Sequence, residues 1–215
     1  MRFDVNEGQL ESYLKLCSTK APAYLEALER ETWLKVTSPH MLTGFAQGRF
    51  LSLISKLLRP NRILEIGTFT GYGTLCLAEG LQTGGKLLTL ESNPENAWLA
   101  QKYVAISPYS DQIEIQIVKA VEILPKLSET WDLVYIDADK VNNQTYFNLC
   151  WPQVSKGGMI LIDNVLANGG VWKPEIEQRS FEKAVSQLNK TLLQTAEATV
   201  TMLPIRDGLT AVLKN

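Results

Sequence analysis

The sequence lacks the features that mark secreted, membrane-spanning and disulfide-stabilised proteins. Its 215 residues include three cysteines, Cys17, Cys76 and Cys150, which are odd in number and far apart, so we interpret them as reduced thiols. No charged segment followed by an apolar one opens the chain, and no apolar run approaches the ~20 residues that a membrane span requires. We therefore expect a cytoplasmic protein with no membrane partner.

An excess of charge of either sign is also missing. The 21 lysines and arginines nearly balance the 23 acidic residues, and the net charge is -2 at pH 7. Such a balance offers no general attraction to nucleic acid or to a membrane surface. The one histidine, His40, has no histidine or cysteine partner for a zinc site, so we interpret it as a turn residue.

The hydrophobic pattern divides residues 1–215, which we expect to form one domain, into two parts. Apolar residues recur at helical spacing in "YLEALERETWLKV" and "FLSLISKLL", so residues 1–60 are predicted to form a helical cap. From residue 61 to 215, short apolar runs alternate with amphipathic segments, a pattern typical of a parallel sheet with helices on both faces. The runs "ATVTMLP" and "GLTAVLKN", joined by "IRDG", predict an antiparallel hairpin at a sheet edge.

Polar residues follow two neighbouring strands of this predicted core. "LVYIDADK" runs into Asp137, Asp139 and Lys140, and "MILIDNVL" runs into Asp163 and Asn164. Ligands of doubly wound sheets bind beyond the carboxyl ends of the strands, and consecutive parallel strands are often neighbours. A single aspartate in such a place is more often a turn former, but the occurrence on two strands favours a site for Mg²⁺ or Ca²⁺ built from Asp137, Asp163 and Asn164.

The first predicted strand carries a signal for a nucleotide-like ligand. "ILEIGTFTGYG" combines a strand, a glycine-rich turn and the start of a helix, although Gly67 and Gly71 do not match the spacing of G-x-G-x-x-G. Glu91 ends the next strand, 20 residues after Gly71, where an acidic residue can accept both hydroxyls of a ribose. The alternative is a tight turn without a ligand.

Taken together, these motifs resemble the S-adenosylmethionine-dependent O-methyltransferases of the caffeoyl-CoA type and, more distantly, the animal catechol O-methyltransferase. The resemblance rests on "EIGTFTGYG", Glu91, "DADK" and "DNVLANG", with "MLTGFAQGRFL" and "LPIRDG" in support, and it covers nearly the whole chain. It implies an α/β, Rossmann-like class I methyltransferase fold. That fold has a seven-stranded mixed sheet with an antiparallel C-terminal hairpin and helices on both faces.

The resemblance also implies roles for single residues. Asp137, Asp163 and Asn164 match the ligands of a divalent metal, and Lys140 matches a general base that acts beside Asp137. Asn168 matches a substrate-side residue. The positions that match the cofactor site, with Glu91 at the ribose and Asp139 at the methionyl amino group, are Thr43, Glu65, Gly67, Thr68, Gly73, Glu91, Ala120 and Asp139.

Two of the candidate residues keep a structural alternative. Lys140 could instead be a surface lysine paired with Asp139. Trp172, which follows "NGG", is a candidate for stacking on an aromatic substrate, with a role outside the site as the alternative.

Three positions depart from the family pattern. Gly73 stands where the family usually has a serine that helps to hold the cofactor carboxylate, Asn143 stands where plant members have a tyrosine, and Arg206 replaces a common glycine. These changes weaken the case for caffeoyl-CoA itself as the acceptor. They leave the metal set untouched.

The function predicted from these residues is metal-dependent O-methylation of a small aromatic vicinal diol of the catechol, flavonoid or hydroxycinnamoyl type. Chelation of two vicinal hydroxyls by the cation would favour such acceptors and lower the pKa of the attacking hydroxyl. A first alternative is methylation of a hydroxylated uridine in transfer RNA, as some bacterial relatives carry out. A second alternative is a non-catalytic module that binds S-adenosylmethionine. Proteins that resemble this one are commonly homodimers, which we also expect here.

Overall fold

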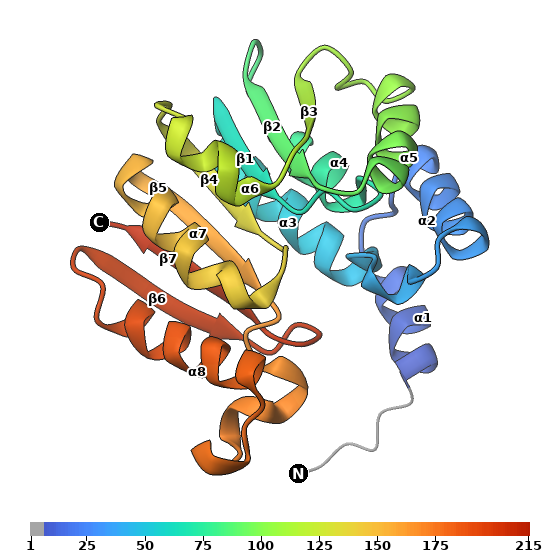
Figure 1. Ribbon diagram of the computed structural model, residues 1–215. Helices are drawn as coiled ribbons and strands as arrows, with labels where there is room; N and C mark the ends of the chain where they lie inside the picture. Colours follow the sequence, from blue (N-terminus) through green and yellow to red (C-terminus); the bar gives the residue numbers. More distant parts are fainter. Residues whose placement is uncertain (1–6) are drawn as a thin grey trace.

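The computed structural model describes residues 7–215, in which a seven-stranded sheet lies between two layers of helices (Figure 1). The strand order is β3-β2-β1-β4-β5-β7-β6, and β7 runs antiparallel to both of its neighbours while the other pairs are parallel. The strands are β1 (Arg62–Ile66), β2 (Lys86–Glu91), β3 (Ile113–Ile117), β4 (Trp131–Ile136), β5 (Val154–Asp163), β6 (Ala198–Leu203) and β7 (Leu209–Lys214).

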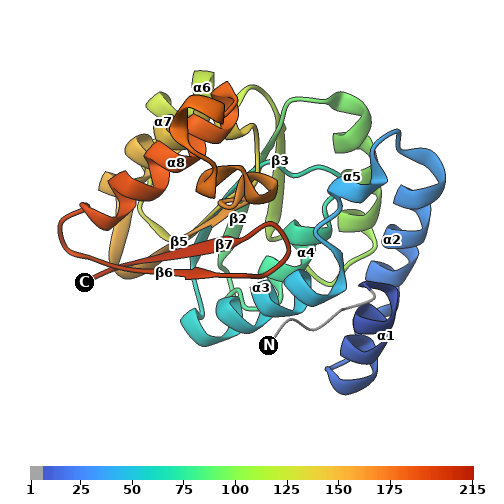
Figure 2. The same ribbon diagram turned by 90° about the horizontal axis from the view of Figure 1, so that it is seen from below.

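Helices cover both faces of the sheet, as the alternating pattern predicts. Figure 2 separates the two layers when the molecule is seen from below. One face carries α2 (Ala23–Lys35), α3 (Gly44–Leu58), α4 (Tyr72–Ala78) and α5 (Pro94–Ala105), with α1 (Glu7–Cys17) against α3. The other face carries α6 (Ala120–Ile123), α7 (Asn143–Cys150) and α8 (Ser180–Leu193).

Short 3₁₀ turns connect these elements. They are η1 (Pro39–Met41), η2 (Leu124–Lys126), η3 (Lys140–Asn142), η4 (Trp151–Gln153), η5 (Ala167–Trp172) and η6 (Glu175–Glu177). Two of them, η3 and η5, come shortly after β4 and β5. They carry residues that the sequence assigns to the site.

Local sequence signals explain where several helices begin and end. Asn93 caps α5, because its side chain accepts a hydrogen bond of 2.9 Å from the backbone N–H of Glu95, and Pro94 occupies the first helical position. Helix α3 ends at Leu58, and Arg59 adopts a left-handed conformation with φ 49° before Pro60.

The predicted seven-stranded mixed sheet and its C-terminal hairpin are confirmed.

One strand begins earlier than its apolar run predicts. Strand β5 starts at Val154, and the run "MILI" begins only at Met159. Val154 pairs with Trp131 in β4, and a register shift between Trp131 and Leu133 absorbs the irregularity. Gly157, with φ 77°, lies within this early part of β5 and allows a backbone turn that a side chain would strain.

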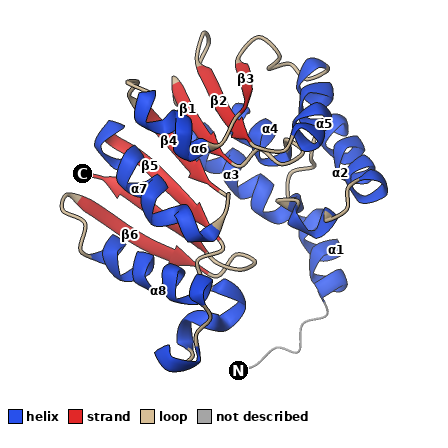
Figure 3. Ribbon diagram, viewed as in Figure 1, coloured by secondary structure: helices blue, strands red, loops and turns tan. Residues whose placement is uncertain are grey.

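The fold brings the carboxyl ends of β1, β2, β4 and β5 to one edge of the sheet, because these strands are parallel neighbours. Figure 3 shows the loops that leave the strands on this side. The motifs "EIGTFTGYG", "DADK" and "DNVLANG", together with Glu91, lie at these strand ends or directly after them. None of the helices within residues 7–215 has the length and apolar character needed to cross a membrane.

Candidate active site

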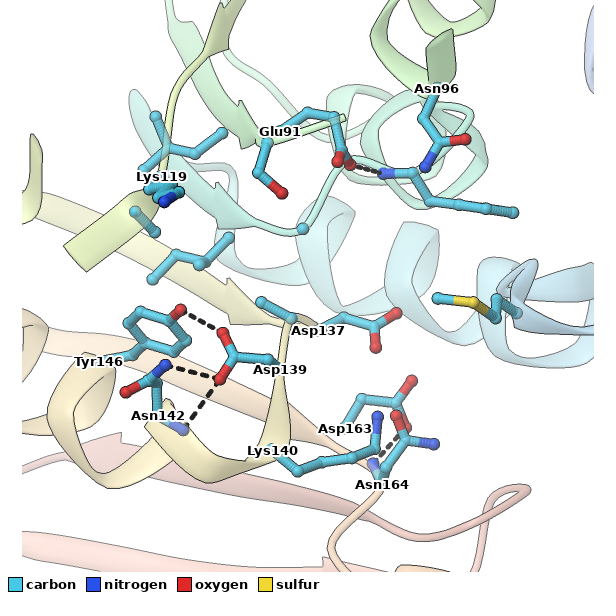
Figure 4. A pocket seen from close by; sticks show the side chains of 18 of the residues that line it. Glu91, Asn96, Lys119, Asp137, Asp139, Lys140, Asn142, Tyr146, Asp163 and Asn164 are labelled. Carbon is cyan, nitrogen blue, oxygen red and sulfur yellow. Dashed lines mark hydrogen bonds between the residues drawn. The ribbon is translucent and has the colours of Figure 1, made fainter. Parts of the chain in front are cut away.

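A cavity of about 810 Å³ opens at the carboxyl ends of the parallel strands (Figure 4). Such a position, beyond the strand ends of a doubly wound sheet, is the usual place for a ligand. The wall of the cavity brings together most of the residues that the sequence predicts for the site. Those residues are Gly67, Glu91, Ala120, Asp137, Asp139, Lys140, Asp163, Asn164 and Asn168.

Two carboxylates face the cavity from neighbouring strands. Asp137 directly follows β4, and Asp163 is the last residue of β5. Burial and the negative charge of Asp163 raise the pKa of Asp137 to about 7, while the charges of Lys140 and Arg206 act in the opposite direction. Within residues 7–215, no lysine or arginine lies within 4.0 Å of either carboxylate, so their mutual repulsion has no direct ion pair to offset it.

Asn164 supplies the amide next to this pair. Its backbone adopts φ 58°, a left-handed conformation that asparagine tolerates better than most residues, and its N–H donates to Oδ1 of Asp163 at 2.7 Å. In the described part of the chain, no group of three or more histidine, cysteine, aspartate or glutamate side chains could hold a metal ion. A cation at this place would therefore take its third protein ligand from the amide oxygen of Asn164.

Glu91 forms the opposite side of the cavity, at the end of β2. Its Oε2 accepts a bond of 2.7 Å from the N–H of Phe69, and its Oε1 accepts one of 2.8 Å from the N–H of Asn93. Burial raises the pKa of this carboxyl. A carboxylate offers about four acceptor sites, so the backbone donors fix the group and still leave acceptor capacity for a ligand.

Gly67 brings the backbone of the first turn against the end of β4. It adopts φ 100°, and a Cβ atom at this position would collide with the carbonyl oxygen of Asp137. Only glycine fits such a close approach. The turn after β1 and the C-terminal end of β4 therefore form one continuous part of the cavity wall.

Four predicted cofactor residues do not line this cavity. Glu65 and Thr68 flank wall residues in sequence but are buried, and Thr43 and Gly73 lie near Glu65. The hydroxyls of Thr74 and Thr89 both donate to Oε2 of Glu65. Glu65 is an interior group, and burial raises the pKa of its carboxyl to about 8 despite these two donors.

Gly73 packs closely against two of these residues. A Cβ atom on Gly73 would lie 3.0 Å from Oε1 of Glu65 and 3.2 Å from Oγ1 of Thr43, closer than ordinary van der Waals contact. The serine that the family pattern favours would therefore crowd both groups. Glu65 and Thr43 both match the family pattern, so they do not by themselves explain the departure at Gly73.

Asp139 and Lys140 point to different parts of the cavity. Oδ2 of Asp139 accepts a bond of 2.6 Å from the hydroxyl of Tyr146, and Oδ1 accepts one of 2.7 Å from the side chain of Asn142. Figure 4 shows Asp139 turned toward Tyr146, and the Lys140 side chain directed toward Asp163 and Asn164. Within residues 7–215 no ion pair joins Lys140 to Asp139, contrary to the structural alternative.

The loop after β5 places its two candidates differently. Asn168 lines the cavity with φ 51°, held by a bond of 2.6 Å from its N–H to Oδ1 of Asp207. Trp172 is 71% exposed, packs near Gly169 of its own turn and does not line the cavity. The structure therefore brings Asn168, but not Trp172, to the site.

Arg206 reaches the cavity from the β6–β7 turn. Its Nη1 donates to the carbonyl oxygens of Leu42 and Thr43, at 2.5 and 2.6 Å, and its Nη2 donates to that of His40 at 3.0 Å. Arg206 adopts φ 50°, which explains why glycine is common at this place. Through these hydrogen bonds, Arg206 connects the segment before α3 to the β6–β7 hairpin.

The sequence interpretation missed several polar residues of the site region. Asn96 and Lys119 line the cavity, and Gln47 and Tyr135 contact its carboxylates. For Tyr135 a signal existed, because side chains two residues apart on a strand share a face and Asp137 lies two residues on. For Gln47 there was none, since 116 residues separate it from Asp163.

Comparisons with known proteins agree with this geometry. A family model described as O-methyltransferase matches residues 15–215. A catechol O-methyltransferase from Niastella koreensis is 38% identical over 143 residues, which cover 65% of this chain and 63% of that protein. A probable caffeoyl-CoA O-methyltransferase from Dictyostelium discoideum is 34% identical over 81% of this chain and 78% of its own length. The O-methyltransferase TomG from Streptomyces achromogenes, solved in complex with SAM, superposes with a TM-score of 0.90 at 26% identity, over 96% of each chain.

Proposed function

The chain belongs to the O-methyltransferase family, and we propose that it methylates a hydroxyl of a small aromatic vicinal diol with the help of a divalent cation. It is an S-adenosylmethionine-dependent enzyme of the caffeoyl-CoA and catechol type. The catechol enzyme of Niastella koreensis supports a diol acceptor. The observation that carries the proposal is that Glu91 and the strand-end set Asp137, Asp163 and Asn164 line one cavity.

The cavity fits the methyl donor at its Glu91 end. The carboxylate of Glu91 has acceptor directions left for two ribose hydroxyls, and Ala120 and Asn96 line the wall nearby without bulky side chains. Gly67 has no side chain to cover the backbone of this wall, so a ligand could contact the backbone atoms directly. The sulfonium of S-adenosylmethionine supplies an activated methyl group, so the residues around it need chiefly to position the acceptor.

The strand-end set fits a hard divalent cation. Two carboxylates and one amide present oxygen atoms at one place, and this is the donor chemistry that Mg²⁺ and Ca²⁺ prefer. Burial and the charge of Asp163 raise the pKa of Asp137, and a cation bound between the two carboxylates would stabilise their ionised forms. When bound, such a cation would lower the pKa of a coordinated hydroxyl and fix its oxygen toward the methyl donor.

The remaining residues of the cavity complete the proposed chemistry. Lys140, directed toward Asp163 and Asn164, is the proposed base: its neutral amine form takes the proton of the attacking hydroxyl and becomes the ammonium. Asn168 holds the acceptor ring from the loop after β5, and Arg206 keeps the opposite rim closed. The carboxylate of Asp139, already held by Tyr146 and Asn142, faces the amino group of the donor.

A methyl-transfer assay tests this function. The purified chain is incubated with labelled S-adenosylmethionine and, in separate reactions, with catechol, a flavonoid diol, caffeoyl-CoA and bulk RNA, each with and without EDTA. We expect methylation of a vicinal diol that stops with EDTA and returns with Mg²⁺. Full turnover of a diol in EDTA would remove the cation from the proposal. If RNA were the only acceptor methylated, RNA would replace the vicinal diol as the proposed substrate.

A further inference from the structure

A fully buried tyrosine contacts both carboxylates of the proposed cation site. Tyr135 lies on β4 and shares its face with Asp137, two residues later. Its hydroxyl oxygen lies 3.2 Å from Oδ2 of Asp137 and 3.1 Å from Oδ2 of Asp163. One hydroxyl therefore connects the ends of two neighbouring strands.

A fully buried glutamine completes this contact from the helical layer. Gln47 lies on α3, which packs against the same face of the sheet. Its Nε2 donates to the hydroxyl of Tyr135 at 2.9 Å and to Oδ2 of Asp163 at 2.6 Å. Both N–H groups of this amide are thereby used.

The number of protons on the Tyr135 hydroxyl and the Gln47 amide determines which carboxylate each can serve as a donor. The Tyr135 hydroxyl carries one proton and already accepts a bond from Gln47, so it can donate to only one carboxylate at a time. Because Gln47 serves Asp163, the tyrosine proton is available to Asp137. Both donors reach Oδ2 atoms, and within residues 7–215 no donor reaches Oδ1 of Asp137.

We propose that Tyr135 and Gln47 are positioning residues that hold Asp137 and Asp163 ready for a divalent cation without contacting it. Two carboxylates that converge without a cation repel each other, and donors behind them offset this repulsion and fix their rotation. Outer-shell donors of this kind commonly change metal affinity by ~10–100-fold. The inference rests on the proposed function, since it presumes that the strand-end set binds a cation.

The test is a calorimetric titration of the purified protein with Mn²⁺ alone, carried out on the wild type and on Tyr135→Phe. The variant keeps the buried ring and removes only the hydroxyl. We expect its Mn²⁺ affinity to fall by ~10–100-fold, while its affinity for S-adenosylmethionine changes by less than ~2-fold. Turnover lost at low cation concentration should return at high concentration, which a general loss of structure would not produce.

Two further variants sharpen the comparison. Tyr103→Phe also removes a tyrosine hydroxyl that donates to a carboxylate, that of Glu31 at 2.7 Å, but outside the cavity, and should leave Mn²⁺ affinity unchanged. Gln47→Met keeps the approximate volume and removes the donors on the α3 side, and should weaken Mn²⁺ binding as Tyr135→Phe does.

The outcomes separate this inference from the proposed function. Wild-type Mn²⁺ affinity in both Tyr135→Phe and Gln47→Met would overturn the positioning role. A wild-type protein that methylates diols but binds no Mn²⁺ would overturn the cation in the proposed function, and this inference with it. An equal loss of cation and cofactor affinity in both variants would also contradict the inference, because it would indicate general damage.

Discussion

The guanidinium of Arg206 donates to the carbonyl oxygen of Thr43 at 2.6 Å, across 163 residues of sequence. Thr43 immediately precedes α3, whose Gln47 donates to the carboxylate of Asp163, and Arg206 lies in the turn of the C-terminal hairpin. A single side chain therefore joins the first and last parts of the described chain at the rim of the site. Its left-handed backbone makes the choice of arginine costly in conformational energy.

Replacing Arg206 should separate these two effects. Arg206→Ala loses three hydrogen bonds and keeps the left-handed strain, so unfolding free energy should fall by ~1–3 kcal/mol. Arg206→Gly loses the same bonds but relaxes the backbone at φ 50°, so it should be ~1 kcal/mol more stable than the alanine variant. Urea unfolding of both variants measures the difference. Equal stability of the two would mean that φ at this position carries no strain.

Glu91→Ala should weaken binding of S-adenosylmethionine by ~1–3 kcal/mol, because the proposed hydrogen bonds to the ribose are charged. The catalytic step should change less once the cofactor is saturating. Isothermal titration measures the affinity, with Glu95→Ala, an exposed residue in the first turn of α5, as the control. An unchanged affinity in the Glu91 variant would exclude this carboxylate as the ribose ligand.

Lys140→Met should lower kcat by ~10²–10⁴-fold, the usual share of general-base catalysis, and leave cofactor affinity nearly unchanged. The limb of the pH–rate profile that reports loss of the lysine proton should disappear as well. Lys156→Met, on an exposed position near the opposite end of β5, is the matched control and should keep wild-type kcat. If Lys140→Met kept both the rate and the limb, the lysine would not be the base.

The buried carboxyl of Glu65 should make stability depend on pH. Its pKa is raised by burial from 4.5 to about 8, so between these values the unfolded chain loses a proton that the native state keeps. Its contribution to stability is therefore fully present below pH 4.5 and is lost as pH rises through 8, by up to about 1.4 kcal/mol per pH unit. Glu65→Gln should remove this slope. Parallel stability profiles for the two proteins between pH 5 and 8 would show that Glu65 is ionised in the native state.

Much of the fold and part of the site could be predicted because the relevant signals are local. Asn93 and Pro94 mark a helix start by residue type, and the residues after β4 and β5 converge because parallel neighbouring strands end at one edge. The convergence of Asp137 and Asp163 could therefore be predicted from the strand order alone.

Other features depend on contacts that no local pattern records. Gln47 reaches Asp163 only because α3 packs on the same face as Tyr135. The close packing of Gly73 against Glu65 and Thr43 is likewise a contact between distant segments. Trp172 had the residue type expected of a stacking partner, but the short η5 turn leaves its ring exposed and away from the cavity.

The position of β7 between β5 and β6 has a consequence for how the protein is made. β7 is the last of the described strands to leave the ribosome, yet it pairs with β5, in the interior of the sheet. Until residues 209–214 have emerged, β5 is an open edge with unpaired backbone groups, the kind of surface on which nascent chains aggregate. Arg206 arrives with the same segment. The rim of the cavity and the protected sheet are therefore completed together, only after β5 and β6 have been made.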